Sequence, residues 1–160
     1  MVGLVEQRLA ELNVTLPRPP SPAANYLPFV RACRLVQLAG VAPVKDGRYA
    51  VVGKLGRELD LDAGRRAARI CALNAIASLN AACDGNLDRV AQFLMVRGFV
   101  NATEDFESVP AVINGASDLI IDIFGPAKGQ HARTSIGCAT LPGRVAVEID
   151  ALVLIDADEV

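Results

Sequence analysis

The chain has 160 residues, a formal net charge of −2 and an isoelectric point near 5.4. This balance lacks the excess of lysine and arginine that a nucleic-acid-binding surface needs, and the absence of tryptophan leaves few rings for base stacking. Hydrophobic residues make up 52 % of the chain, but no apolar run reaches the roughly 18 residues that span a bilayer, so no membrane partner is expected.

A mean hydropathy of +0.33 is high for a soluble monomer of this size and indicates a buried subunit interface. The N-terminus lacks the basic, apolar and small-residue layout of a signal peptide. The four cysteines, Cys33, Cys71, Cys83 and Cys138, have no paired spacing and predict buried, reduced thiols. We therefore expect a cytoplasmic protein.

The first half of the chain predicts a helix and two strands. Apolar residues recur at helical spacing over residues 2–12, and the prolines of residues 17–22 predict an extended connector. Residues 31–38 predict a first strand that ends at Ala39-Gly40. The Asp46-Gly47 turn then predicts that residues 49–52 pair back on this strand.

Two long helices and a strand follow. Asp60 or Asp62 is the expected N-cap of a helix that ends near Cys83. Residues 87–100 predict a long apolar strand, and Thr103 or Ser108 is expected to cap a second helix that ends at residues 125–126.

The last third predicts two strands joined by a tight turn at Pro142-Gly143. In this register Gly137 lies opposite Glu148, and Ser135 lies opposite Asp150. Alternation then gives one polar face and one core face. The polar face carries Arg133, Ser135, Gly137 and Glu148, and the core face carries Ile136, Cys138, Val147, Ile149 and Val153. The space above Gly137 could hold an anion matched to a guanidinium fork.

The predicted order is helix, two strands, helix, strand, helix and two strands. It indicates an α+β fold with both long helices on one face of a sheet. We divide the chain into an N-terminal helix with its proline connector, residues 1–24, and a main domain, residues 25–160.

Two motifs resemble those of a known family. The stretch Ala132-Arg-Thr-Ser-Ile-Gly-Cys-Ala-Thr-Leu-Pro142, followed by Val147-Glu-Ile-Asp-Ala151, is similar to the signature of the reactive-intermediate deaminases, also called the Rid or YjgF-like family and formerly endoribonuclease L-PSP. The resemblance continues upstream in Ala39-Gly40 and Ala72-Leu73-Asn74. It covers residues 25–155, so the chain resembles a longer branch of the family.

This resemblance implies a chorismate-mutase-like fold, assembled as a homotrimer around a central barrel with clefts between subunits. Active members hydrolyse enamines and imines of 2-amino acids to 2-keto acids and ammonia, without a cofactor or metal. The resemblance makes Arg133 the carboxylate anchor and Glu148 the residue that positions water. It places Tyr26, Ala39, Gly40, Asn114 and Ser135 around the substrate, a small carboxylate-bearing metabolite.

The chain departs from the family pattern at two positions, and other functions stay open. Ala39 replaces the usual serine and removes a hydroxyl near the substrate, whereas Ser135 replaces a cysteine. The first change supports an alternative in which the trimer binds a small carboxylate without catalysis. A ribonuclease of the L-PSP type is a third possibility, against which the acidic isoelectric point counts.

Other polar features receive structural interpretations. His131 is interpreted as a rim residue, because one histidine among unspaced cysteines cannot build a metal site. Gly53-Lys54 resembles a fragment of a phosphate-binding loop but lacks the Ser or Thr that such loops require.

Overall fold

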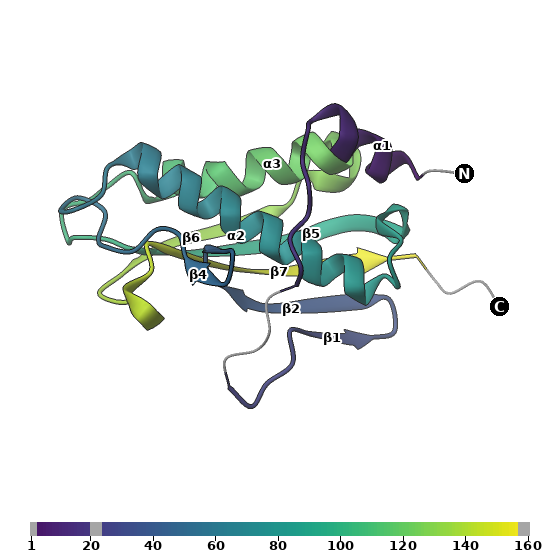
Figure 1. Ribbon diagram of the computed structural model, residues 1–160, viewed down its shortest axis with the longest axis horizontal. Helices are drawn as coiled ribbons and strands as arrows, with labels where there is room; N and C mark the ends of the chain where they lie inside the picture. The colour runs from purple at the N-terminus through teal and green to yellow at the C-terminus, as the bar shows by residue number, and fades with distance from the viewer. Residues whose placement is uncertain (1–2, 20–23, 157–160) are drawn as a thin grey trace.

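The computed structural model describes residues 3–19 and 24–156. Figure 1 shows a twisted sheet with the two long helices α2 and α3 across one of its faces, which confirms the predicted α+β class. Among the described residues, no helix is long and apolar enough to cross a membrane. The elements are α1 (Leu4–Glu11), β1 (Phe29–Ala32), β2 (Leu35–Val41), β3 (Val44–Lys45), β4 (Arg48–Tyr49), α2 (Leu61–Ala82), the 3-10 turn η1 (Leu87–Arg89), β5 (Val90–Asn101), α3 (Val109–Gly129), β6 (Ala132–Cys138), the 3-10 turn η2 (Pro142–Arg144) and β7 (Val147–Ile155).

Both long helices begin where the sequence predicts. Asp60 caps α2 by accepting a 2.8 Å hydrogen bond from the Ala63 amide. Ser108 stands at the N-cap of α3, although its side chain makes no capping hydrogen bond, and Pro110 lies in the first turn. The expected end of α3 at Gly125 is a kink instead, because Gly125 takes a φ of 74° and the helix continues to Gly129.

The strand order β1-β2-β7-β5-β6 contradicts the predicted C-terminal hairpin. β5 lies between β6 and β7, parallel to the first and antiparallel to the second. Strands that flank a third strand are about 10 Å apart, too far for a two-residue turn, and residues 139–146 span this gap. The observed partners are Gly137 with Val100, Ser135 with Gly98, Glu148 with Phe99 and Asp150 with Arg97.

The first strand also differs from its prediction. Residues 29–41 form a β1–β2 hairpin that turns at Cys33, whose φ is 53°. The Asp46-Gly47 turn is confirmed, but it joins the short strands β3 and β4, which form a separate two-stranded sheet. Residues 49–52 do not pair back on the first strand, and Val52 instead bridges to Val145. Local alternation gives the turn correctly but does not identify the strand's partner.

The core lies between the sheet and the two long helices. Alternate residues of β7 point into it and are fully or almost fully buried: Val147, Ile149, Ala151, Val153 and Ile155. Gly98 of β5 leaves room for Ile113 of α3, because a Cβ atom at position 98 would overlap the Ile113 side chain. The helices cover one face only, so the opposite face of the sheet is open (Figure 1).

The N-terminal helix α1 is held by a distant carboxylate. Asp88 in η1 accepts hydrogen bonds of 2.8 Å from the amides of Leu4 and Val5, at the N-terminus of α1. Arg8 donates a 2.9 Å bond to the carbonyl of Asp122 in α3. The helix therefore docks on the main domain through specific contacts.

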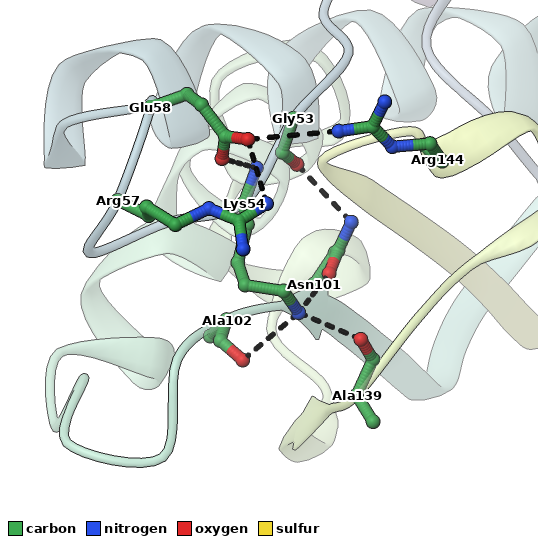
Figure 2. A network of polar contacts seen from close by, with 8 residues as sticks. All are labelled: Gly53, Lys54, Arg57, Glu58, Asn101, Ala102, Ala139 and Arg144. Atoms are coloured by element: carbon green, nitrogen blue, oxygen red, sulfur yellow. Dashed lines mark hydrogen bonds and ion pairs between the residues drawn. The ribbon is translucent and has the colours of Figure 1, made fainter.

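Lys54, in the stretch that resembles a fragment of a phosphate-binding loop, forms hydrogen bonds at the ends of two strands (Figure 2). Its ammonium donates to Asn101 Oδ1 at 2.5 Å, to the Ala139 carbonyl at 2.6 Å and to the Ala102 carbonyl at 3.3 Å. Asn101 in turn donates to the Gly53 carbonyl at 3.2 Å. These bonds join the chain around residue 54 to the ends of β5 and β6, a structural role.

Candidate functional site

The seven predicted site residues fall into two groups. Tyr26, Ala39, Gly40 and Glu148 line one open cavity of about 1430 Å³, which we call the glutamate cavity. Asn114, Arg133 and Ser135 lie along β6 and the adjoining side of α3, and we call this group the arginine site. The wall of the glutamate cavity also includes residues 17–19 of the proline connector.

The glutamate cavity is shaped by a bulge in β2. Between the pairs Leu38–Ala151 and Val41–Ile149, β2 has one residue more than β7, so Ala39 and Gly40 occupy a β-bulge. Gly40 lies so close to Glu148 that a Cβ atom there would overlap Oε1 of the carboxylate. The missing side chain at position 40 thus allows the carboxylate its observed place.

The surroundings of Glu148 raise the pKa of its carboxyl. Its side chain is half-buried, and this burial raises the pKa of the carboxyl above its usual 4.5, with a further contribution from the negative charge of Asp150. Asp150 itself is held by Arg97, whose Nε donates to Oδ1 at 2.8 Å. A carboxyl with a raised pKa is a better proton acceptor at neutral pH than an ordinary surface glutamate.

The arginine site is built from neutral partners. Arg133 Nη1 donates to Asn114 Oδ1 at 2.8 Å and to Ser117 Oγ at 3.2 Å, and both acceptors lie on α3, one turn apart. No carboxylate among the described residues pairs with Arg133, and its side chain is exposed. Within the described part of the chain, neither Glu148 nor Asp150 forms an ion pair with Arg133. Arg133 therefore keeps its full charge for an external anion.

The expected single polar face is wrong. Arg133 pairs with Val96, which is buried under the helices, so its side chain lies on the helix-covered face. Glu148 pairs with Phe99 and alternates with the buried Val147, so it lies on the open face. The two principal site residues thus lie on opposite faces of the sheet in one chain.

The same shift changes the neighbours of Arg133. Ile136, expected in the core, is 47 % exposed because it alternates to the open face. Ser135 faces the helices, where its hydroxyl is buried without a hydrogen-bond partner among the described residues. Cys138, also expected in the core, is only partly buried, and its thiol donates a hydrogen bond of 3.4 Å to the carbonyl of Val100.

The residues that sequence reasoning missed are Ser117 and His131. His131, expected at the rim, is partly buried and lies 3.0 Å from Ser117 Oγ through its Nε2. Two signals could have found them: Ser117 lies one helical turn after Asn114, and His131 lies two residues before Arg133. Four polar side chains thus lie behind or beside the guanidinium of Arg133, namely Asn114, Ser117, His131 and Ser135. Of these, Asn114 and Ser135 were predicted as site residues.

Metal-binding geometry is missing from the part of the chain that the structure describes. Within residues 3–19 and 24–156, no three His, Cys, Asp or Glu side chains form a group that could hold a metal ion. The four cysteines are free thiols, although Cys33 is exposed rather than buried as expected. Burial raises the pKa of the Cys71 thiol, which keeps it protonated.

The chain is similar to known proteins over nearly its whole length. A family model described as "YjgF/chorismate_mutase-like, putative endoribonuclease" matches residues 6–153. Protein TCP17 of Trypanosoma cruzi is 40 % identical over 151 residues, which cover 94 % of this chain and 94 % of that protein. A structure of a protein of unknown function from Agrobacterium tumefaciens is 42 % identical with a TM-score of 0.88, and the match covers 96 % of this chain and 93 % of that one.

A more distant likeness concerns the fold alone. The structure of TdcF from E. coli, solved with bound serine, has a TM-score of 0.63 and 20 % identity, over 87 % of this chain and 94 % of that chain. The family match spans nearly the whole chain and includes both motifs around Arg133 and Glu148, which confirms the resemblance. The chain belongs to the YjgF/chorismate-mutase-like family, also known as the L-PSP endoribonuclease family.

Proposed function

We propose that the protein is an enamine and imine deaminase, which hydrolyses reactive 2-imino and 2-enamino acids to 2-keto acids and ammonia. The observation that carries this proposal is the chemistry of the two site groups. Arg133 offers an uncompensated guanidinium for a carboxylate, and Glu148 offers a carboxyl whose pKa is raised by burial. An anchor for the carboxylate and a base for the attacking water are the two groups that the proposed hydrolysis uses.

The proposed site takes Arg133 from one subunit and Glu148 from its neighbour. Within one chain the two side chains lie on opposite faces of the sheet, so a cleft between subunits is the arrangement that can bring them together. We propose a homotrimer that surrounds a central barrel with its sheets. The open face supports such an interface, because it carries the partly or largely exposed apolar residues Val30, Leu35, Met95, Phe99, Ile136, Leu152 and Leu154.

Arg133 would bind the carboxylate of the substrate. Asn114 and Ser117 both accept from the same nitrogen, Nη1, and the other N–H groups of the guanidinium have no partner among the described residues. A planar fork can then receive both oxygens of a carboxylate, a geometry that a lysine could not offer. This anchoring fixes the imine carbon relative to the neighbouring subunit's Glu148.

Glu148 would act on water. In the protonated imine, the Glu148 carboxylate removes a proton from water as the water oxygen bonds to the imine carbon, and the electron pair of the C=N double bond moves to nitrogen, which gives a neutral carbinolamine. Glu148 then gives this proton to the amino nitrogen. The C–N bond breaks as the oxygen forms the C=O bond, and the hydroxyl proton passes through Glu148 to the departing ammonia, so that a 2-keto acid and an ammonium ion leave. Because an iminium carbon is already electrophilic, these reaction steps need no cofactor.

A second candidate function is a trimer that binds a small carboxylate without catalysis. Ala39 favours it, because a methyl group stands in the wall of the glutamate cavity where the family commonly has a hydroxyl. In that case Arg133 would still bind 2-keto acids, whereas imine decay would be unchanged.

The test follows imine decay directly. An amino-acid oxidase generates 2-iminopropanoate and 2-iminobutanoate in situ, and their disappearance is measured with wild type and Arg133→Ala. We expect faster decay with wild type and the spontaneous rate with Arg133→Ala. Arg69→Ala is the matched control, because Arg69 is exposed on α2 and makes no ion pair with a described residue. No acceleration by folded wild type would reject the deaminase for these substrates and favour the binding protein.

A further inference from the structure

Behind Arg133 lies a chain of hydrogen bonds to which the proposed hydrolysis assigns no task. Arg133 Nη1 lies 3.2 Å from Ser117 Oγ, which lies 3.0 Å from His131 Nε2. The other ring nitrogen, Nδ1, lies 2.6 Å from the carbonyl oxygen of Gly129. Four groups from α3 and β6, and from the segment between them, thus form one continuous line.

The chemistry of these groups fixes the direction of every bond in this line. The Gly129 carbonyl can only accept, so Nδ1 carries the ring hydrogen and donates a hydrogen bond to this carbonyl. In a neutral ring Nε2 is then an acceptor, and the Ser117 hydroxyl must donate to it. The remaining lone pairs of Ser117 Oγ are left to accept from Arg133, so the line has a single consistent arrangement.

Burial keeps the histidine in this state. Ser117 is only 7 % exposed. Burial lowers the pKa of His131, and the nearby charge of Arg133 lowers it further, although the bond to Gly129 acts in the opposite direction. Arg133 is the charged group that acts on the ring; the side chain of α3 that touches the ring, Ser117, is neutral. The neutral ring is therefore the prevalent form at physiological pH.

We propose that His131, acting through Ser117, is a positioning residue that holds the guanidinium of Arg133 in its carboxylate-binding orientation before the ligand arrives. An exposed arginine on an edge strand otherwise samples many rotamers, and ordering it costs side-chain conformational entropy. Asn114 and Ser117 both accept from Nη1, so the N–H groups of Nε and Nη2 have no partner among the described residues and are available to a carboxylate. The inference rests on the proposed role of Arg133 as carboxylate anchor.

Ser117 and His131 also have the spacing of a nucleophile and its base, and the same experiment separates the two roles. If His131 and Ser117 position Arg133, a variant that lacks either of them should have a higher KM, because the unbound arginine is then disordered. If Ser117 is a nucleophile, its loss should instead abolish kcat. The burial of Ser117 behind Arg133 favours positioning.

The kinetic test uses 2-iminopropanoate and variants of the full-length protein. His131→Leu removes the acceptor for Ser117, so we expect KM to rise about fivefold to tenfold with kcat changed less than twofold. His131→Gln can still offer an amide oxygen to Ser117 and should restore part of the loss. Gln130→Ala is the control, because this neighbouring side chain is exposed and makes no bond to the site. An unchanged KM in His131→Leu, or a lost kcat in Ser117→Ala, would overturn the inference.

A second readout does not depend on catalysis. His131 is the only histidine of the chain, so its ring proton gives one resolved NMR titration. Pyruvate bound at Arg133 would offset the positive charge and raise the pKa of His131, an effect that Arg133→Ala should abolish. A raised pKa without imine hydrolysis would reject the deaminase but keep the inference. Pyruvate binding, measured by calorimetry, that leaves the His131 pKa unchanged would reject the inference alone, and no binding would reject the carboxylate anchor together with it.

Discussion

A single methyl group at position 40 should disable the proposed reaction while the protein stays folded. Gly40 has no positive φ, so alanine is compatible with its backbone. The added Cβ atom would overlap Oε1 of Glu148, which is the far end of a flexible side chain and can move away. To regain ordinary contact the carboxylate must shift by about 1 Å, which costs about 100-fold in kcat, or about 2.7 kcal/mol in the barrier.

The assay measures kcat for 2-iminopropanoate and the thermal midpoint of Gly40→Ala. Gly98→Ala is the contrasting variant, because its Cβ atom would meet Ile113 in the packed core, where overpacking costs about 1–3 kcal/mol of stability. We expect Gly40→Ala to lose activity at an unchanged midpoint and Gly98→Ala to lower the midpoint. Wild-type kcat in Gly40→Ala would refute the reasoning that the position of the Glu148 carboxylate matters for the chemistry.

Three further predictions concern single side chains. Asp88→Ala removes the cap of α1 and should cost about 1 kcal/mol, with faster hydrogen exchange at the first amides of α1; unchanged exchange would contradict the capping role. Lys54→Met leaves its three oxygen acceptors without a donor and should lower stability in urea by about 1–3 kcal/mol, whereas Lys45→Met, at an exposed site, should have little effect. Because the pKa of Glu148 is raised in the folded protein, its contribution to stability is complete below pH 4.5 and is lost as the pH rises through the folded pKa. Glu148→Gln should therefore have a higher thermal midpoint than wild type at neutral pH, and this difference should disappear below pH 4.5. Equal midpoints at pH 7 would count against the raised pKa of Glu148.

Local signals in the sequence predicted the helices well. Asp60 marks the start of α2 because a side-chain cap depends on residues within one turn, and Ser108 stands at the N-cap of α3 although its side chain makes no capping bond. The Asp46-Gly47 turn is equally local, and it was predicted correctly. These features depend on neighbours along the chain, which a sequence displays directly.

Strand partners could not be predicted in this way. The alternation in residues 132–138 and 147–155 is compatible with a hairpin, but the insertion of β5 between them depends on long-range packing. This single difference moved Arg133 and Glu148 to opposite faces. It also hid Ser117 and His131, since their contact with Arg133 depends on how β6 lies beside α3.

The central proposal, a site shared between two subunits, is tested most directly by mixing two inactive variants. Arg133→Ala and Glu148→Gln each lack one half of every site, so we expect neither variant alone to hydrolyse 2-iminopropanoate. Refolded together in equal amounts, subunits of the two kinds meet at random, and about one quarter of the interfaces should combine an intact Arg133 with an intact Glu148. The account predicts recovery of about 25 % of wild-type activity per site in the mixture. A mixture as inactive as its components, although mixed oligomers have formed, would contradict it.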